Sequence, residues 1–250
     1  MRLLVGLLLC ACAAGLVLSS GAVTADRGYD VTGTPLRPAL VAHDSSGQHH
    51  DGVNQGRPVL GLAGHRGTSY SFDRRGSWVE VPSTPALSPG TRSFSLSAWV
   101  RFSTEPRGHR TFDIVRKGLS FTRTGEFKME IIRGGVVRCT AKDVDGDRAR
   151  ISGFGHPVTN GRWHRIGCSR TATTWTVHVD RWTRSEVDLL GAVSNNIPLS
   201  LGSKYGLEDM PEGRLDEVRL RIAGRTVGLW HLDEKPSLPA RPSPVRPGRR

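Results

Sequence analysis

The sequence has 250 residues, of which 37% are hydrophobic and 23% are charged. These proportions supply enough apolar side chains for one substantial core and exclude a chain that is disordered throughout. Thirty glycines and fifteen prolines disfavour long helices. The composition also excludes collagen, coiled coils and polytopic membrane proteins.

The formal net charge is +12, but part of it lies at the two ends of the chain. Arg2 is the only charged residue among the first 25, and residues 235–250 carry five basic residues and no acidic one. Residues 26–234 retain 29 basic against 23 acidic residues, spread along the chain. Nucleic-acid-binding segments instead gather basic residues with stacking aromatic ones. We predict no nucleic-acid partner, and a basic surface that favours anionic partners such as acidic glycans or cell-envelope polysaccharides.

The first 25 residues are typical of a signal peptide. Arg2 precedes an apolar run from Leu3 to Leu18, and the small residues Val23 and Ala25 fit a cleavage site after Ala25. The alternative is a lipoprotein anchored at Cys12. No other stretch approaches 18 apolar residues, so we predict a secreted, extracellular protein without a mature membrane span. Residues 26–38 are interpreted as a flexible leader.

Short runs with strand periodicity follow one another through the rest of the chain. In the clearest run, Phe94 to Phe102, apolar residues alternate with Ser95, Ser97, Trp99 and Arg101, which indicates a half-buried strand. Further strands are predicted at residues 78–81, 127–132, 136–142, 148–152, 166–168, 174–180, 198–201 and 215–220. Many short strands without a convincing helix predict an all-β, antiparallel two-sheet β-sandwich. The Pro- and Arg-rich residues 235–250 predict a disordered tail.

Two cysteines remain after the signal peptide. Cys139 and Cys168 lie in separate strand-like runs, with no CxxC spacing that would indicate a metal or redox site. In an oxidising environment such a pair predicts a disulfide.

At this point the order of motifs resembles that of a laminin-G-like domain, a concanavalin A-like jelly roll. The resemblance covers about residues 39–222 and is closest to short secreted actinobacterial members. Its motifs are DSSGQHHDG (44–52), SFD (71–73), WVEVP (78–82), FSLSAWVRF (94–102), IVRKG (114–118), GRWHRIGCSR (161–170), VHVD (177–180), NNIPLSLGSK (195–204) and GRLDEVRL (213–220). We therefore place a laminin-G-like jelly-roll domain at residues 39–234.

One departure from the family pattern concerns its opening aromatic strand, which is missing before Asp44. An equivalent sequence, Val227 to Glu234, stands near the C-terminus instead. It is either the remnant of a second repeat or a strand that still completes the sandwich. We favour the second interpretation, in which Trp230 is buried.

The resemblance implies a binding fold and no particular ligand. We predict a non-catalytic module for carbohydrate, with a protein–protein adhesion module and a degenerate glycoside hydrolase as alternatives. A laminarinase-type site needs a Glu-x-Asp-x-x-Glu strand, and the run from Glu186 through Asp188 lacks the second glutamate. No catalytic residue is assigned.

Two ligand sites are predicted, the first of them from the same resemblance. A calcium site near the DSSG loop would use Asp44, Asp51 and Asp216, with Asp233 as a further candidate. No other cofactor is expected. Trp182 is the surface candidate for stacking on a sugar, whereas Trp78, Trp99 and Trp163 are expected to fill the sandwich.

Overall fold

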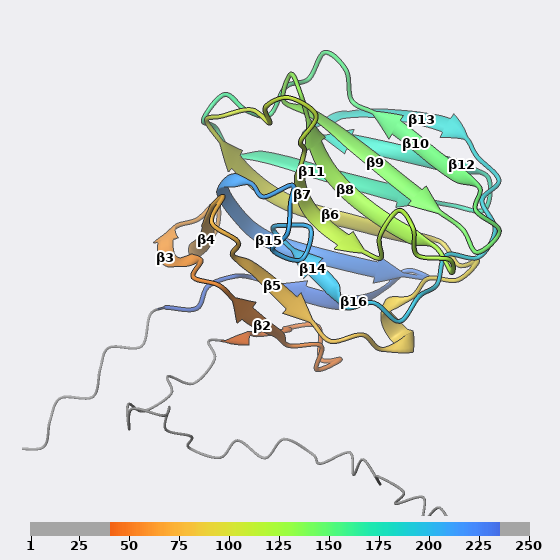
Figure 1. Ribbon diagram of the computed structural model, residues 1–250, viewed down its shortest axis with the longest axis horizontal. Helices are drawn as coiled ribbons and strands as arrows, with labels where there is room; N and C mark the ends of the chain where they lie inside the picture. Colours follow the sequence, from red (N-terminus) through yellow and green to blue (C-terminus); the bar gives the residue numbers. More distant parts are fainter. Residues whose placement is uncertain (1–40, 236–250) are drawn as a thin grey trace, which may run out of the picture. The chain divides into compact units, whose positions relative to one another are not determined.

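Two antiparallel sheets face each other in the computed structural model, which describes residues 41–235 (Figure 1). The predicted signal peptide, the leader and residues 236–250 of the predicted tail lie outside the described residues. The β8 sheet has the strand order β1-β2-β5-β14-β7-β8-β9-β10. The β6 sheet has the order β13-β12-β11-β6-β15-β4-β3, and β16 also pairs with β15. The predicted two-sheet jelly roll is confirmed.

The strands of the β8 sheet have these bounds: β1 Val41–Ala42, β2 Gly52–Gln55, β5 Trp78–Val81, β7 Phe112–Lys117, β8 Glu126–Ile132, β9 Val136–Lys142, β10 Arg148–Ser152 and β14 Leu199–Leu201. Those of the β6 sheet are β3 Val59–Ala63, β4 Thr68–Asp73, β6 Phe94–Phe102, β11 His164–Arg170, β12 Thr174–Val179, β13 Trp182–Val187, β15 Glu212–Ile222 and β16 Arg225–Trp230. A short 3₁₀ helix spans Pro85–Leu87. Within residues 41–235 no helix is long and apolar enough to cross a membrane.

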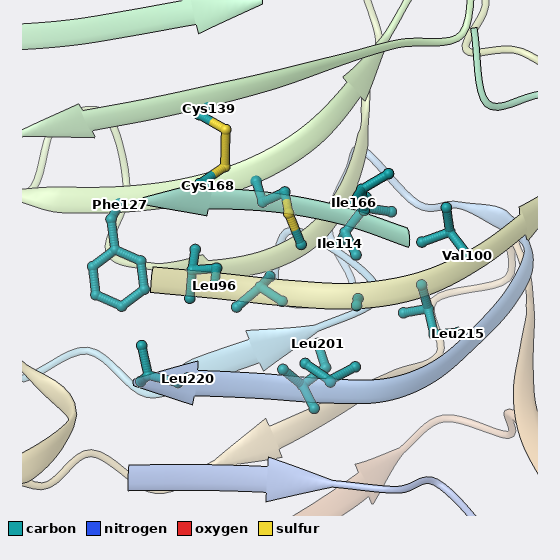
Figure 2. Close-up of a cluster of buried hydrophobic side chains, with 14 of the residues drawn as sticks. Leu96, Val100, Ile114, Phe127, Cys139, Ile166, Cys168, Leu201, Leu215 and Leu220 are labelled. Carbon is teal, nitrogen blue, oxygen red and sulfur yellow. A yellow bond between two sulfur atoms is a disulfide. The ribbon is translucent and has the colours of Figure 1, made fainter. Parts of the chain in front are cut away.

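Strand β6 lies in the middle of its sheet, between β11 and β15. Its apolar residues Phe94, Leu96, Ala98, Val100 and Phe102 are buried, as their alternation predicts. They meet side chains of the β8 sheet such as Ile114 and Phe127 in the core (Figure 2). The residues between them point to the opposite surface of the sheet.

A disulfide joins the two sheets through this core. Cys139 of β9 and Cys168 of β11 are fully buried and bonded, with their Cα atoms 5.6 Å apart (Figure 2). The predicted bond is confirmed, and it links one strand of each sheet.

The C-terminal segment completes the sandwich, which favours the second of the two interpretations above. Strand β16 pairs with β15, and Trp230 is fully buried with its indole N–H donating to the carbonyl of His50 at 2.9 Å. On its other side, Ser45 N–H donates to the Leu229 carbonyl at 2.8 Å, so β16 lies beside the start of the domain.

The disulfide gives a first prediction. Replacing Cys139 and Cys168 together with serine should lower the free energy of unfolding by about 3–4 kcal/mol, because the bond closes a loop of 29 residues in the unfolded chain. Chemical denaturation of the variant and the wild type measures the difference. Alkylation of both thiols in unreduced, denatured wild-type protein would contradict the bond itself.

Trp230 gives a second prediction. The Trp230→Ala variant should lose roughly 3–5 kcal/mol of stability, because a large buried side chain leaves a cavity. Leu229→Ala is the matched control: Leu229 is only partly buried on the neighbouring position of the strand and should cost much less. Similar melting temperatures for the Trp230→Ala protein and the wild type would show that β16 contributes little to the domain.

Candidate functional site

The outer surface of the β6 sheet has a floor of small side chains. Directly paired residues in an antiparallel sheet lie on the same face. Ser95 of β6 pairs with Ser169 of β11, and Ser97 pairs with Gly167. These four residues therefore form a low strip across the centre of the sheet.

Larger side chains rise on both flanks of this strip. On one side β15 contributes Arg219, opposite Ser97, and Arg221, opposite Ser95. On the other side stands His178 of β12, opposite Gly167. Arg165 of β11, opposite Trp99, stands at one end of the strip. Together they enclose a trough of about 230 Å³, which we call the arginine trough.

Gly167 is required by the close approach of its neighbours. A Cβ atom at this position would lie 2.9 Å from the Leu96 carbonyl oxygen and 3.6 Å from the His178 ring. The imidazole thus lies directly over the strip, where it shares a hydrogen bond of 2.9 Å between Nε2 and the Ser169 hydroxyl. Burial lowers the pKa of His178, and the nearby Arg165 lowers it further. His178 is consequently neutral at pH 7.

The arginine trough carries an excess of positive charge. Within the described part of the chain, Arg165, Arg219 and Arg221 form no ion pair with a carboxylate. The one carboxylate among the lining residues, Asp180, accepts the Arg165 backbone N–H at 2.9 Å and bonds His164 at 2.8 Å. Arg221 also donates to the Gly224 carbonyl at 2.6 Å. Three guanidinium groups without a carboxylate partner therefore face an anionic ligand.

An aromatic pocket continues the trough at one end. It is lined by Trp99, Arg162, Trp163, His164, Arg165, Asp180 and Arg181, so it shares Arg165 and Asp180 with the trough. The His65 ring stacks on Trp99 with centroids 3.4 Å apart, and Trp163 meets His65 edge-on at 6.4 Å. The prediction that Trp78, Trp99 and Trp163 fill the sandwich is wrong: all three are partly exposed. The completely buried tryptophans are Trp175 and Trp230.

Asp216 holds the loop that carries His65. Its side chain is fully buried, and one oxygen accepts the Arg66 backbone N–H at 2.9 Å. Burial raises the pKa of Asp216, although the backbone N–H groups of Arg66 and His65 act in the opposite direction. Asp233 accepts the Thr68 backbone N–H at 2.6 Å, farther along the same loop.

The predicted calcium ligands do not come together as one group. Asp44 accepts hydrogen bonds from the backbone N–H groups of Ser46, His50 and Leu229 and from the Ser46 hydroxyl. Burial opposes ionisation of Asp44, but these bonds outweigh it and lower its pKa. The Asp51 carboxylate accepts the Asp44 backbone N–H at 2.7 Å.

The carboxylate oxygens of Asp44 thus already organise the DSSG loop, while Asp216 and Asp233 anchor a different loop. Among residues 41–235 no three His, Cys, Asp or Glu side chains are placed to share a metal ion. The residues present do not fit the predicted shell, and calcium binding remains a prediction from the resemblance alone.

Trp182, the predicted stacking residue, lines neither the trough nor the aromatic pocket. Its ring packs against His156, with centroids 4.3 Å apart, and against the edge of the core. Glu186 is exposed on strand β13, where it pairs with Arg184.

The outer surface of the β8 sheet carries charged side chains that pair with one another. Asp113 bonds Arg116, and Glu130 bonds both Lys128 and Arg138 at 2.6 Å. Burial opposes ionisation of Glu130, but the two bases outweigh it and lower its pKa. Asp113 is also fully buried, and burial raises its pKa to about 6 although Arg116 and Lys128 lower it. This surface therefore offers less free charge to a ligand than the unpaired arginines do.

Comparison with known proteins agrees with the fold. A family model of the laminin G type, described as the concanavalin A-like lectin/glucanases superfamily, matches residues 73–222. Neurexin-1a-beta of Danio rerio is 27% identical over 180 residues, which are 69% of this chain and 34% of that protein. The chain therefore spans about a third of that relative's length.

Solved structures with the same fold include two binding domains of botulinum neurotoxins. The botulinum neurotoxin serotype C1 binding domain has a TM-score of 0.57 and 14% identity, covering 74% of this chain and 46% of that chain. The binding domain of botulinum neurotoxin DC in complex with SialylT has a TM-score of 0.55 and 13% identity, covering 73% of this chain and 45% of that chain. At such identities the likeness concerns the fold alone.

Proposed function

This chain belongs to the concanavalin A-like lectin/glucanases superfamily, and we propose that it is a secreted, non-catalytic module that binds an acidic glycan or cell-envelope polysaccharide. The observation that carries the proposal is the arginine trough with its aromatic end. Three unpaired arginines supply charge-assisted hydrogen bonds to carboxylate, sulfate or phosphate groups. Trp99 and Trp163 supply flat apolar surfaces beside them.

The trough suits an extended chain better than a compact molecule. The strip at its floor is made of serine and glycine, which leave room for a polymer to lie on the sheet. Hydroxyl groups of Ser95 and Ser97 face the same space and match the hydroxyls of sugars.

Secretion fits the disulfide between Cys139 and Cys168, since such bonds form and persist in oxidising compartments. Glu186 lies on an exposed edge strand and pairs with Arg184 rather than with a second acid. This position supports the non-catalytic part of the proposal. Both points support a binding role outside the cell.

Charge reversal in the trough should abolish binding. We expect Arg219→Glu with Arg221→Glu to weaken binding of dextran sulfate by at least tenfold, because two attractive contacts become repulsive. Isothermal titration calorimetry measures the dissociation constants, and uncharged dextran tests whether charge is needed.

The matched control is Arg57→Glu with Arg133→Glu, which makes the same change in net charge at two exposed positions outside the trough. It should lower the affinity much less. Equal losses in the two double variants would mean that only the overall charge matters. No binding by the wild type would refute the glycan proposal and leave the adhesion alternative.

The pH dependence should depend on His178. Because burial and Arg165 lower its pKa, the imidazole is neutral at pH 7 and gains a proton only as the pH falls below its ordinary range. Protonation adds a charge beside three arginines, so dextran sulfate should bind more tightly at pH 5 than at pH 7. His178→Gln should reduce this difference, whereas His109→Gln, at an exposed position outside the trough, should not. An identical pH profile for wild type and His178→Gln would exclude His178 from the site.

A further inference from the structure

Strand β13 is an edge of the β6 sheet with an unusual degree of exposure. It pairs with β12 on one side, and within residues 41–235 no strand covers its other side. Five of its six residues are exposed, from Thr183 to Val187, and Val187 is 80% exposed. Backbone groups along a free edge are a ready template for another strand.

Proteins commonly protect such an edge with a single type of charge or with proline, so that two copies cannot join. Strand β13 has neither. Its charged residues are one base, Arg184, and one acid, Glu186, which lie on the same face two positions apart and bond each other at 2.6 Å. The position between them is Ser185.

This order makes the strand complementary to itself. If two copies of β13 pair antiparallel with Ser185 opposite Ser185, Arg184 of each copy lies opposite Glu186 of the other. The same register places Thr183 opposite Val187, a pair of β-branched residues that suits a sheet. A register centred on Arg184 or on Glu186 would oppose like charges, so the charges select one register.

We propose that β13 pairs with β13 of a second copy of this chain, forming a two-fold symmetric dimer with a continuous β6 sheet. An interface of this kind is isologous, because the same residues serve both partners. It is also small, so the dimer forms reversibly as concentration rises.

The pairing has a functional consequence. Directly opposed residues of two antiparallel strands lie on the same face, so the outer surfaces of the two β6 sheets face the same side. Both arginine troughs then open in one direction, across which a single polymer or surface can bind twice. The dimer itself does not depend on the trough or its ligand.

Analytical ultracentrifugation of the purified chain at about 0.15 M salt tests the proposal, since the net charge of +12 would otherwise drive copies apart. The average mass should rise from one chain toward two with concentration. Arg184→Glu and Glu186→Arg should each weaken this association roughly tenfold or more, because each places like charges opposite each other at two points.

Mixing the two single variants is the decisive experiment. The Arg184→Glu chain carries acidic side chains at both positions, and the Glu186→Arg chain carries basic side chains at both. Every opposed pair between the two chains is then acid against base, so the mixture should form a heterodimer that neither variant forms alone. The double swap, Arg184→Glu with Glu186→Arg, should restore the homodimer. Equal melting temperatures of all variants check that the fold is intact.

Two results would overturn the proposal. One is a wild-type chain that stays monomeric at every concentration tested. The other is a wild-type dimer that both single variants retain, which would place the interface elsewhere. Binding of dextran sulfate is measured separately, so a monomeric chain that binds the polymer would refute the dimer and leave the proposed function intact.

Discussion

The two-residue alternation of strand β6 is the constraint on which both the core and the proposed site depend. Its inward residues, Phe94 to Phe102 at every second position, meet the opposite sheet, while Ser95, Ser97 and Trp99 lie on the outer surface. A shift of the strand by one position would exchange the two sets, placing serines in the core and apolar side chains in solvent. Burial of the inner face therefore also fixes the floor of the trough.

A single irregularity in β15 places the arginines beside that floor. The pairing of β15 with β6 shifts between Asp216 and Arg219, where three steps along β15 match two along β6. Glu217, with φ of 52°, is the extra residue. Regular alternation from Asp216 would have turned Arg219 inward. The bulge restores Val218 and Leu220 to the core and directs Arg219 and Arg221 outward.

Local patterns of the sequence predicted the features that depend on local chemistry. Strand β6 follows from its alternation, the disulfide from two cysteines in a chain with a predicted signal peptide, and the burial of Trp230 from the strand that the family pattern lacks before Asp44. The arginine trough could not be predicted in this way. Arg165, Arg219 and Arg221 come from two strands separated by more than forty residues, and only the register of β11, β6 and β15 brings them together.

Dependence on contacts between distant segments also explains why several predicted site residues have other roles in the structure. Asp44 and Asp216 belong to motifs that the resemblance treats as one site, yet Asp44 bonds the backbone of its own loop and Asp216 bonds that of the His65 loop. Trp99 stands on the outward side of its strand, but the sequence alone does not show that the His65 loop packs against it. The sequence did not indicate the bulge at Glu217, because it has no glycine or proline at this point of the strand.

A site built on strands has different physical properties from one built on loops. The floor and flanks of the trough belong to strands that pack on the core, and the disulfide ties one of them, β11, to the opposite sheet. Little ordering is therefore required when a ligand binds. Its openness has the opposite effect, because a ligand that lies on a sheet buries only part of its surface. In the proposed complex, charge at the arginines supplies most of the attraction, and the aromatic end supplies orientation. On this proposal each unit of a polymer binds weakly, so the effective strength depends on how many units, or how many copies of the domain, bind at once.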